Sequence, residues 1–216
     1  TAEDLDNKTD KSVTKEGLDS ILKDVKNLIP NVNVRDSITQ YSGLRPNRNP
    51  EGLHVDTYDD LKGYINLSGV RSTGLTLSVA MGVYVADVMR EMGAPMVFKE
   101  NFISTRKGIV RFHELSREEQ DEIVKENPAY GRVICRCEMI TEGEILDAIH
   151  RPLGARSLDG VKRRTRAGMG RCQSGFCSPK VMEILEREVP MPVDQIGKNG
   201  VGSEFILGEN KELEDE

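Results

Sequence analysis

Four cysteines are the residues of this 216-residue chain whose type and spacing most clearly predict chemistry. They form two close pairs, Cys135-x-Cys137 and Cys172-x4-Cys177, and the chain has no other cysteine. Thiolates are soft, polarisable ligands, and four that converge bind iron–sulfur clusters or zinc. The grouping therefore predicts a metal centre in the C-terminal half of the chain.

On spacing alone, three uses of the cysteines stay open. Structural disulfides are disfavoured because nothing in the sequence marks an oxidising compartment. Structural zinc usually takes two Cys-x2–4-Cys knuckles, and the Cys135/Cys137 pair is tighter than that. A 2Fe-2S cluster on four thiolates is anionic, so it needs positive charge and N–H donors around it. We favour the cluster because the neighbouring sequence offers both.

The segment between the two pairs is basic and then rich in glycine. Gly168, Gly170 and Gly175 allow the backbone to approach a cluster, and Ser178-Pro179 is expected to cap and open a helix whose positive end faces it. Such a run is also typical of a solvated or nucleic-acid-binding surface, although the net charge of −6 argues against general nucleic-acid binding. Against the single acid Asp159, residues 150–171 carry seven basic residues: Arg151, Arg156, Lys162, Arg163, Arg164, Arg166 and Arg171.

Helix signals surround the cysteines and continue upstream. Capping boxes at Thr141/Glu144 and Ser116/Glu119 predict helix starts, and Ser157 is expected to cap a short helix that ends near Thr165. Apolar residues at helical spacing predict a further helix between Thr14 and Ile29, which Pro30 ends. Short strands are expected at Ser37–Tyr41, Gly63–Leu67 and Gly108–Phe112.

A glycine-containing turn, residues 69–74, leads into an apolar helical pattern that runs from Leu75 to Met89. The free N–H groups at such a turn suit a phosphate or another electron-rich group, and a purely structural turn is an equally open interpretation. Ser78, Gly82 and Asp87 interrupt the apolar window, so we expect no membrane span.

The stretch from Val133-Ile-Cys-Arg-Cys-Glu to Arg171-Cys-Gln-Ser-Gly-Phe-Cys177 resembles the bacterioferritin-associated-ferredoxin-like (BFD-like) 2Fe-2S domain. More narrowly, it resembles the copy at the C-terminus of FAD-dependent glycerol-3-phosphate dehydrogenases of the anaerobic type. The resemblance implies a mostly helical module in which Cys135, Cys137, Cys172 and Cys177 bind the cluster.

Residues 38–46 and 63–76 look like the closing part of the same family's flavin domain. The resemblance implies that Arg45 of the Gly-x-Arg-Pro element meets an anionic substrate, since a guanidinium donates two parallel hydrogen bonds to phosphate. Without the resemblance, Arg45 and Arg71 are taken as surface arginines. The residues implied to lie beside the flavin are Gly69, Arg71, Ser72, Gly74, Leu75 and Thr76.

The Gly-x-Gly-x-x-Gly fingerprint that holds the FAD pyrophosphate does not occur in the sequence, and the first residue is Thr1. We therefore expect a C-terminal fragment of a longer enzyme, inactive by itself and weak in binding FAD. The expected fold class is α+β: part of an FAD-oxidoreductase substrate or cap region, with strands and two long helices, followed by a small helical 2Fe-2S domain. The expected boundaries are 1–98, a docking linker at 99–128, the cluster domain at 129–190 and a tail at 191–216 whose acidic end is disordered.

The predicted function is transfer of electrons from FAD through a 2Fe-2S cluster to an acceptor, after oxidation of glycerol 3-phosphate or a related small anion. Expected partners are the N-terminal FAD-binding half and an electron-acceptor protein or subunit, with no nucleic acid and no membrane span. The expected location is the cytoplasm, or the membrane periphery through a partner subunit. The alternative is a zinc-stabilised four-cysteine adaptor without redox activity.

Overall fold

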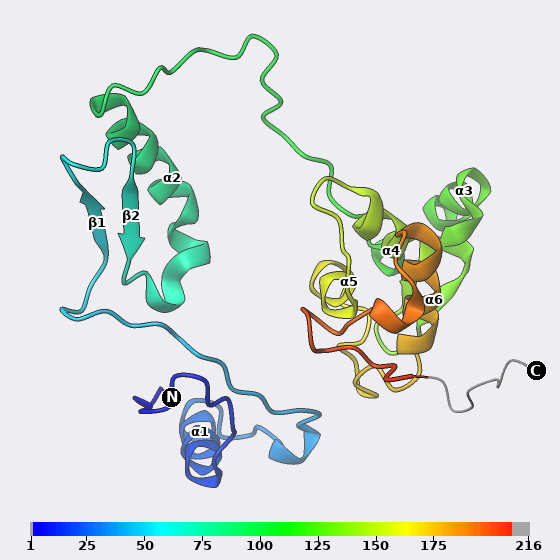
Figure 1. Cartoon of the computed structure of the whole chain (residues 1–216). Helices are drawn as coiled ribbons and strands as arrows, with labels where there is room; N and C mark the ends of the chain where they lie inside the picture. Colours follow the sequence, from blue (N-terminus) through cyan, green and yellow to red (C-terminus); the bar gives the residue numbers. More distant parts are fainter. Residues whose placement is uncertain (1, 209–216) are drawn as a thin grey trace, which may run out of the picture. The chain divides into compact units, whose positions relative to one another are not determined.

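The computed structural model describes residues 2–208 and separates into two compact units, one within residues 1–104 and one within 105–216 (Figure 1). Each unit combines helices with one two-stranded antiparallel sheet, which confirms the α+β class. The acidic end at 209–216, for which we predicted disorder, lies outside the described residues.

The first unit begins with helix α1 (Lys15–Leu28). The Thr14 side chain accepts a hydrogen bond from the Gly17 N–H, as the capping signal predicted, and Ile29 ends the helix before Pro30. A short 3-10 turn, η1 (Val34–Asp36), follows. The strand predicted at Ser37–Tyr41 is wrong, because this exposed stretch has no neighbouring strand to pair with.

The sheet of the first unit is a hairpin of β1 (His54–Thr57) and β2 (Ile65–Ser68), with Val55 opposite Leu67. Arg48 fastens the preceding loop to this hairpin, donating to Asp56 and Ser68 at 2.7 Å each. The 3-10 turn η2 (Arg71–Thr73) then leads into helix α2 (Gly74–Glu91), the long apolar helix that the sequence predicted.

No described residue of the first unit is buried, and α2 leaves much of its apolar surface exposed. By length and composition alone, the segment Arg71–Glu91 meets the criteria for a membrane-spanning helix, with a mean hydropathy of 1.3. Core helices of soluble proteins meet the same criteria, so this is weak support for a span.

The second unit holds the buried core. It opens with the 3-10 turn η3 (Phe112–Glu114), where we predicted a strand; that prediction is wrong, because residues 108–112 pair with no other strand. Helix α3 (Arg117–Glu126) starts at the predicted Ser116/Glu119 capping box, and η4 (Pro128–Gly131) follows it.

The rest of the unit contains the hairpin β3 (Val133–Cys135) and β4 (Ile140–Thr141), then α4 (Glu142–His150), α5 (Leu158–Thr165), α6 (Ser178–Glu188) and η5 (Val193–Gln195). Thr141 and Ser157 cap α4 and α5 as predicted. Side chains of α4, α5 and α6 meet in one apolar core, which the loop residue Ile196 completes. This core includes Cys135 and Cys177, so the packing itself brings the two cysteine segments together.

Candidate metal centre

The first cysteine pair lies in the turn of the β3–β4 hairpin. Cys135 is the last residue of β3 and faces Ile140 across the hairpin, and the pairing shifts register between Val133 and Cys135. Cys137 follows in the turn, which Met139 closes with a left-handed backbone (φ 54°). The irregular register allows Cys135 to point into the core while Cys137 stays exposed.

The second pair lies in the loop between α5 and α6. Arg166 ends α5 in the left-handed conformation (φ 73°), and Gln173 and Ser174 also have positive φ. Cys177 occupies the N-cap position of α6 without a side-chain cap hydrogen bond, so the cap predicted at Ser178 is wrong; Ser178 is the first helical residue, and its hydroxyl donates to the Ser174 carbonyl. The first turn of α6 thus starts directly at a cysteine.

The four thiols are free and come together in neighbouring pairs. The Sγ atoms of Cys137 and Cys172 are 3.5 Å apart at the surface. Cys135 and Cys177 lie in the core, with exposed fractions of 1% and 3%. Across residues 2–208, no three His, Cys, Asp or Glu side chains converge closely enough to hold a single ion as they stand. Paired thiols match the donor set of a 2Fe-2S cluster, in which each of the two irons binds two thiolates.

The surroundings shift the pKa values of Cys172 and of the buried Cys177 in opposite directions. The Cys137 thiol lowers the pKa of Cys172, and so do the nearby backbone N–H groups of Phe176, Ser174 and Gly175. Burial raises the pKa of the Cys177 thiol to about 12, with contributions from Cys135 and Cys172. Four free thiols in neighbouring pairs, with backbone N–H groups close to the exposed pair, are the donor set that an anionic cluster requires, so the loop fits such a group.

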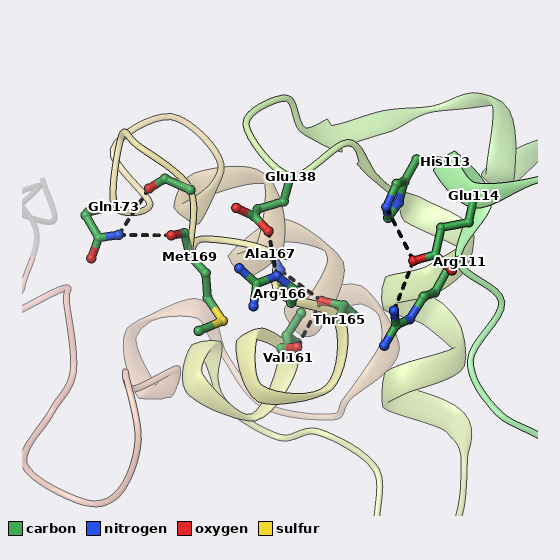
Figure 2. Close-up of polar contacts among 11 residues, drawn as sticks. Arg111, His113, Glu114, Glu138, Val161, Thr165, Arg166, Ala167, Met169 and Gln173 are labelled. Atoms are coloured by element: carbon green, nitrogen blue, oxygen red, sulfur yellow. Dashed lines mark hydrogen bonds and ion pairs between the residues drawn. The ribbon is translucent and has the colours of Figure 1, made fainter. Parts of the chain in front are cut away.

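The two cysteine loops are also joined by an ion pair and by close backbone packing. Figure 2 shows Glu138, next to Cys137, accepting from Arg166 at 2.7 Å. A Cβ added at Gly170 would lie 2.2 Å from the Cβ of Cys137. The sequence analysis did not identify the Glu138–Arg166 pair. The signal that could have identified it is their opposite charge, since Glu138 follows the first cysteine pair and Arg166 precedes the second.

Most of the basic run does not surround the cysteines, contrary to our expectation of a positive shell. Arg151 pairs with Asp147, and both Lys162 and Arg163 pair with Asp159. Arg156 donates to the backbone carbonyls of Ile149 and Ala155. Arg164 donates to those of Gly160 and Leu153. The run therefore mainly stabilises helices α4 and α5 and the loop between them.

The implied flavin and substrate residues lie in the first unit, whereas the cysteines lie in the second. Gly69 has a positive φ of 72°, and a Cβ there would lie 1.8 Å from the Gly52 carbonyl oxygen, so this position requires glycine. Arg71 pairs with Glu51 at 3.1 Å, Ser72 lies in η2, and Gly74, Leu75 and Thr76 form the first turn of α2. Arg45 is exposed in the loop before the hairpin.

We expect Gly170→Ala to lower cluster incorporation. The added methyl group overlaps Cys137, so the two loops must move apart, and overpacking of this kind costs about 1–3 kcal/mol. The measurement is iron and sulfide per chain after anaerobic reconstitution. Gly200→Ala is the matched control, since nothing lies within 4 Å of its added Cβ. Equal loading of the two variants would contradict the prediction.

Comparison with known proteins assigns both units. Residues 1–88 match the FAD dependent oxidoreductase family, and residues 133–187 match the BFD-like [2Fe-2S] binding domain. The chain is 44% identical over 210 residues to a glycerol 3-phosphate dehydrogenase of Caloramator mitchellensis, covering 97% of this chain and 44% of that protein. It is 27% identical over 210 residues to one subunit of the anaerobic glycerol-3-phosphate dehydrogenase of Escherichia coli K12, covering 82% and 38%.

A third relative matches a shorter stretch of the chain at higher identity. The hydrogen cyanide synthase subunit HcnB of Pseudomonas aeruginosa is 47% identical over 59 residues, covering 26% of this chain and 12% of that protein. No solved structure matches the chain significantly. The chain spans less than half the length of these relatives. Both halves of the sequence resemblance are thus confirmed: the chain joins a region of the FAD dependent oxidoreductase family to a BFD-like 2Fe-2S domain.

Proposed function

We propose that this chain is the C-terminal part of a flavin-dependent dehydrogenase that oxidises glycerol 3-phosphate or a related small anionic substrate. The relative from Caloramator mitchellensis, which aligns with nearly the whole chain, supports this assignment. The observation that carries it is the position of the four free cysteines: they form neighbouring pairs in the unit that contains the BFD-like 2Fe-2S match.

Bound FAD would supply the hydride acceptor, and the cluster would supply one-electron transfer onward. For this chain's own residues, we propose that Arg45 holds the anionic end of the substrate. We further propose that the tight turn at Gly69, the η2 turn and the first turn of α2 lie beside the flavin. Two observations support the second assignment: the match to the oxidoreductase family includes these turns, and the Leu75 side chain is 93% exposed in this unit.

We propose the division 1–98, 99–128, 129–190 and 191–216 for the oxidoreductase portion, docking linker, cluster domain and tail; the linker from Thr105 onwards and the tail residue Ile196 belong to the same compact unit as the cluster domain. The proposed partners are an N-terminal FAD-binding half and an electron-acceptor protein or subunit, and the names of two relatives as subunits support the latter. Because most of α2 lies within the oxidoreductase match, we propose that its apolar surface packs in the core of the complete oxidoreductase region. We therefore propose a cytoplasmic location, or a membrane-peripheral one through a partner subunit.

Iron and sulfide analysis tests the proposal directly. Anaerobically reconstituted chain should contain about two irons and two sulfides and show a red-brown absorption and a 2Fe-2S electron paramagnetic resonance (EPR) signal after reduction. Stoichiometric zinc without labile sulfide under the same conditions would overturn the cluster and favour the zinc-stabilised adaptor. Handling must be anaerobic, because oxygen can destroy an exposed cluster and leave its site to zinc.

A further inference from the structure

The structure assigns the surface around Cys137 and Cys172 as the docking face through which electrons leave the cluster for an acidic redox protein. We define this exit face by the exposed residues that lie close in sequence to Cys137, Cys172 and Cys177: Arg136, Met139, Met169, Arg171 and Phe176. The inference rests on the proposed function and adds to it the position of the exit and the charge of the partner.

The first observation is the unequal burial of the four sulfurs. Cys135 and Cys177 are enclosed by the core, whereas Cys137 is exposed and Cys172 is half-buried. Electron transfer weakens steeply with distance, so a partner protein gains the shortest route by docking over the exposed pair. One electron passes from the reduced cluster to the partner, so the cluster is oxidised and the partner reduced by one electron each. No bond is made or broken, and no proton is required.

The second observation is where apolar side chains reach the solvent. In the described part of the second unit, residues 105–208, eight large apolar side chains are exposed: Met139, Leu153, Met169, Phe176, Val201, Phe205, Ile206 and Leu207. Three of these lie within three residues of a cysteine, and Phe176, which directly precedes Cys177, is 84% exposed. Exposed apolar groups gathered at one place are typical of a protein–protein contact, where Phe and Met are favoured.

The third observation is the charge of this face. Side chains of Arg136 and Arg171 make no hydrogen bond or ion pair with any residue in the described range 2–208, unlike most arginines of the unit. Glu138, the acidic residue next to Cys137, pairs with Arg166, as Figure 2 shows. Two unpaired guanidinium groups beside apolar side chains, on a chain whose net charge is −6, complement an acidic rim around an apolar centre.

Stopped-flow oxidation of the reduced 216-residue chain tests the assignment. The chain is loaded with its cluster, reduced anaerobically with dithionite, freed of excess reductant, and mixed with plastocyanin (acidic), cytochrome c (basic) or benzoquinone (small and neutral). For the wild type, the second-order rate constant with plastocyanin should fall as salt rises, because salt screens attraction. The rate constant with cytochrome c should rise with salt, because salt screens the repulsion between its basic surface and the exit face.

Arg136→Glu/Arg171→Glu should lower the plastocyanin rate constant on the order of 10-fold or more at low salt. The same variant should react faster with cytochrome c, and both differences should shrink in about 1 M salt, where charges are screened within about 3 Å. Phe176→Ser should lower the rate constants with both plastocyanin and cytochrome c at every salt concentration. The control Arg117→Glu reverses one charge in the same way, half the charge change of the double variant, in α3, which packs on η4, and it should leave all rates unchanged.

Two results would overturn the exit face while the cluster itself stands. One is a plastocyanin rate for the double variant equal to that of Arg117→Glu. The other is an equal slowing with benzoquinone, which would place the effect in the cluster rather than in docking. If the wild-type chain shows no 2Fe-2S EPR signal before mixing, the proposed function fails, and the exit face fails with it.

Discussion

Replacing Cys177 by alanine should remove the iron–sulfur cluster and destabilise the second unit. Cys177 is 3% exposed and directly precedes α6, so no solvent ligand can take the place of its sulfur without disturbing the core. Loss of a bound metal centre and of a buried group costs about 2 kcal/mol or more. For a unit of this size, that lowers Tm by about 8–16 °C.

The measurements are iron and sulfide per chain, the visible spectrum, and Tm under anaerobic conditions. Val181→Ala is the matched control, since Val181 is also 3% exposed and lies on the same helix but is not a ligand. It should lower Tm through lost packing and keep its full iron content. Retention of about two irons per chain in Cys177→Ala would remove Cys177 from the ligand set.

Helices of this chain were predictable because their starting signals are local. At Ser116, Thr141 and Ser157 the capping side chain accepts a backbone N–H three residues later, an interaction that a few neighbouring residues determine. The strands were less predictable. Ser37–Tyr41 and Gly108–Phe112 have strand-like composition, but a strand also needs a partner edge, and neither segment finds one.

The candidate site, too, was predictable only in part. The cysteine spacing identified the four thiols, because ligand type is a property of single residues. Their unequal burial depends on the irregular β3–β4 pairing and on the loop before α6, which only tertiary packing determines. The basic run shows the opposite failure: composition predicted a charged shell, whereas Asp147, Asp159 and backbone carbonyls bind most of its members.

Arg45→Ala should weaken substrate use strongly in the enzyme that includes the flavin half. If the guanidinium holds the phosphate of glycerol 3-phosphate, its loss removes a charge-assisted, two-pronged contact worth about 1.5–3 kcal/mol, or about 10- to 150-fold in kcat/KM. Arg45→Lys should lose less, because a lysine keeps the charge but cannot reproduce the planar fork. The measurement is steady-state kinetics with an artificial acceptor that takes electrons directly from the flavin.

The neighbouring arginines sharpen this test. Arg48 is committed to Asp56 and Ser68 and Arg71 to Glu51, whereas the Arg45 side chain makes no hydrogen bond or ion pair with a described residue. Arg35→Ala is the matched control, since Arg35 is exposed in the same unit, and it should leave kcat/KM unchanged. Inhibition by inorganic phosphate should weaken in parallel in Arg45→Ala, because the same contact is lost. Wild-type kcat/KM together with wild-type phosphate inhibition would make Arg45 an ordinary surface arginine.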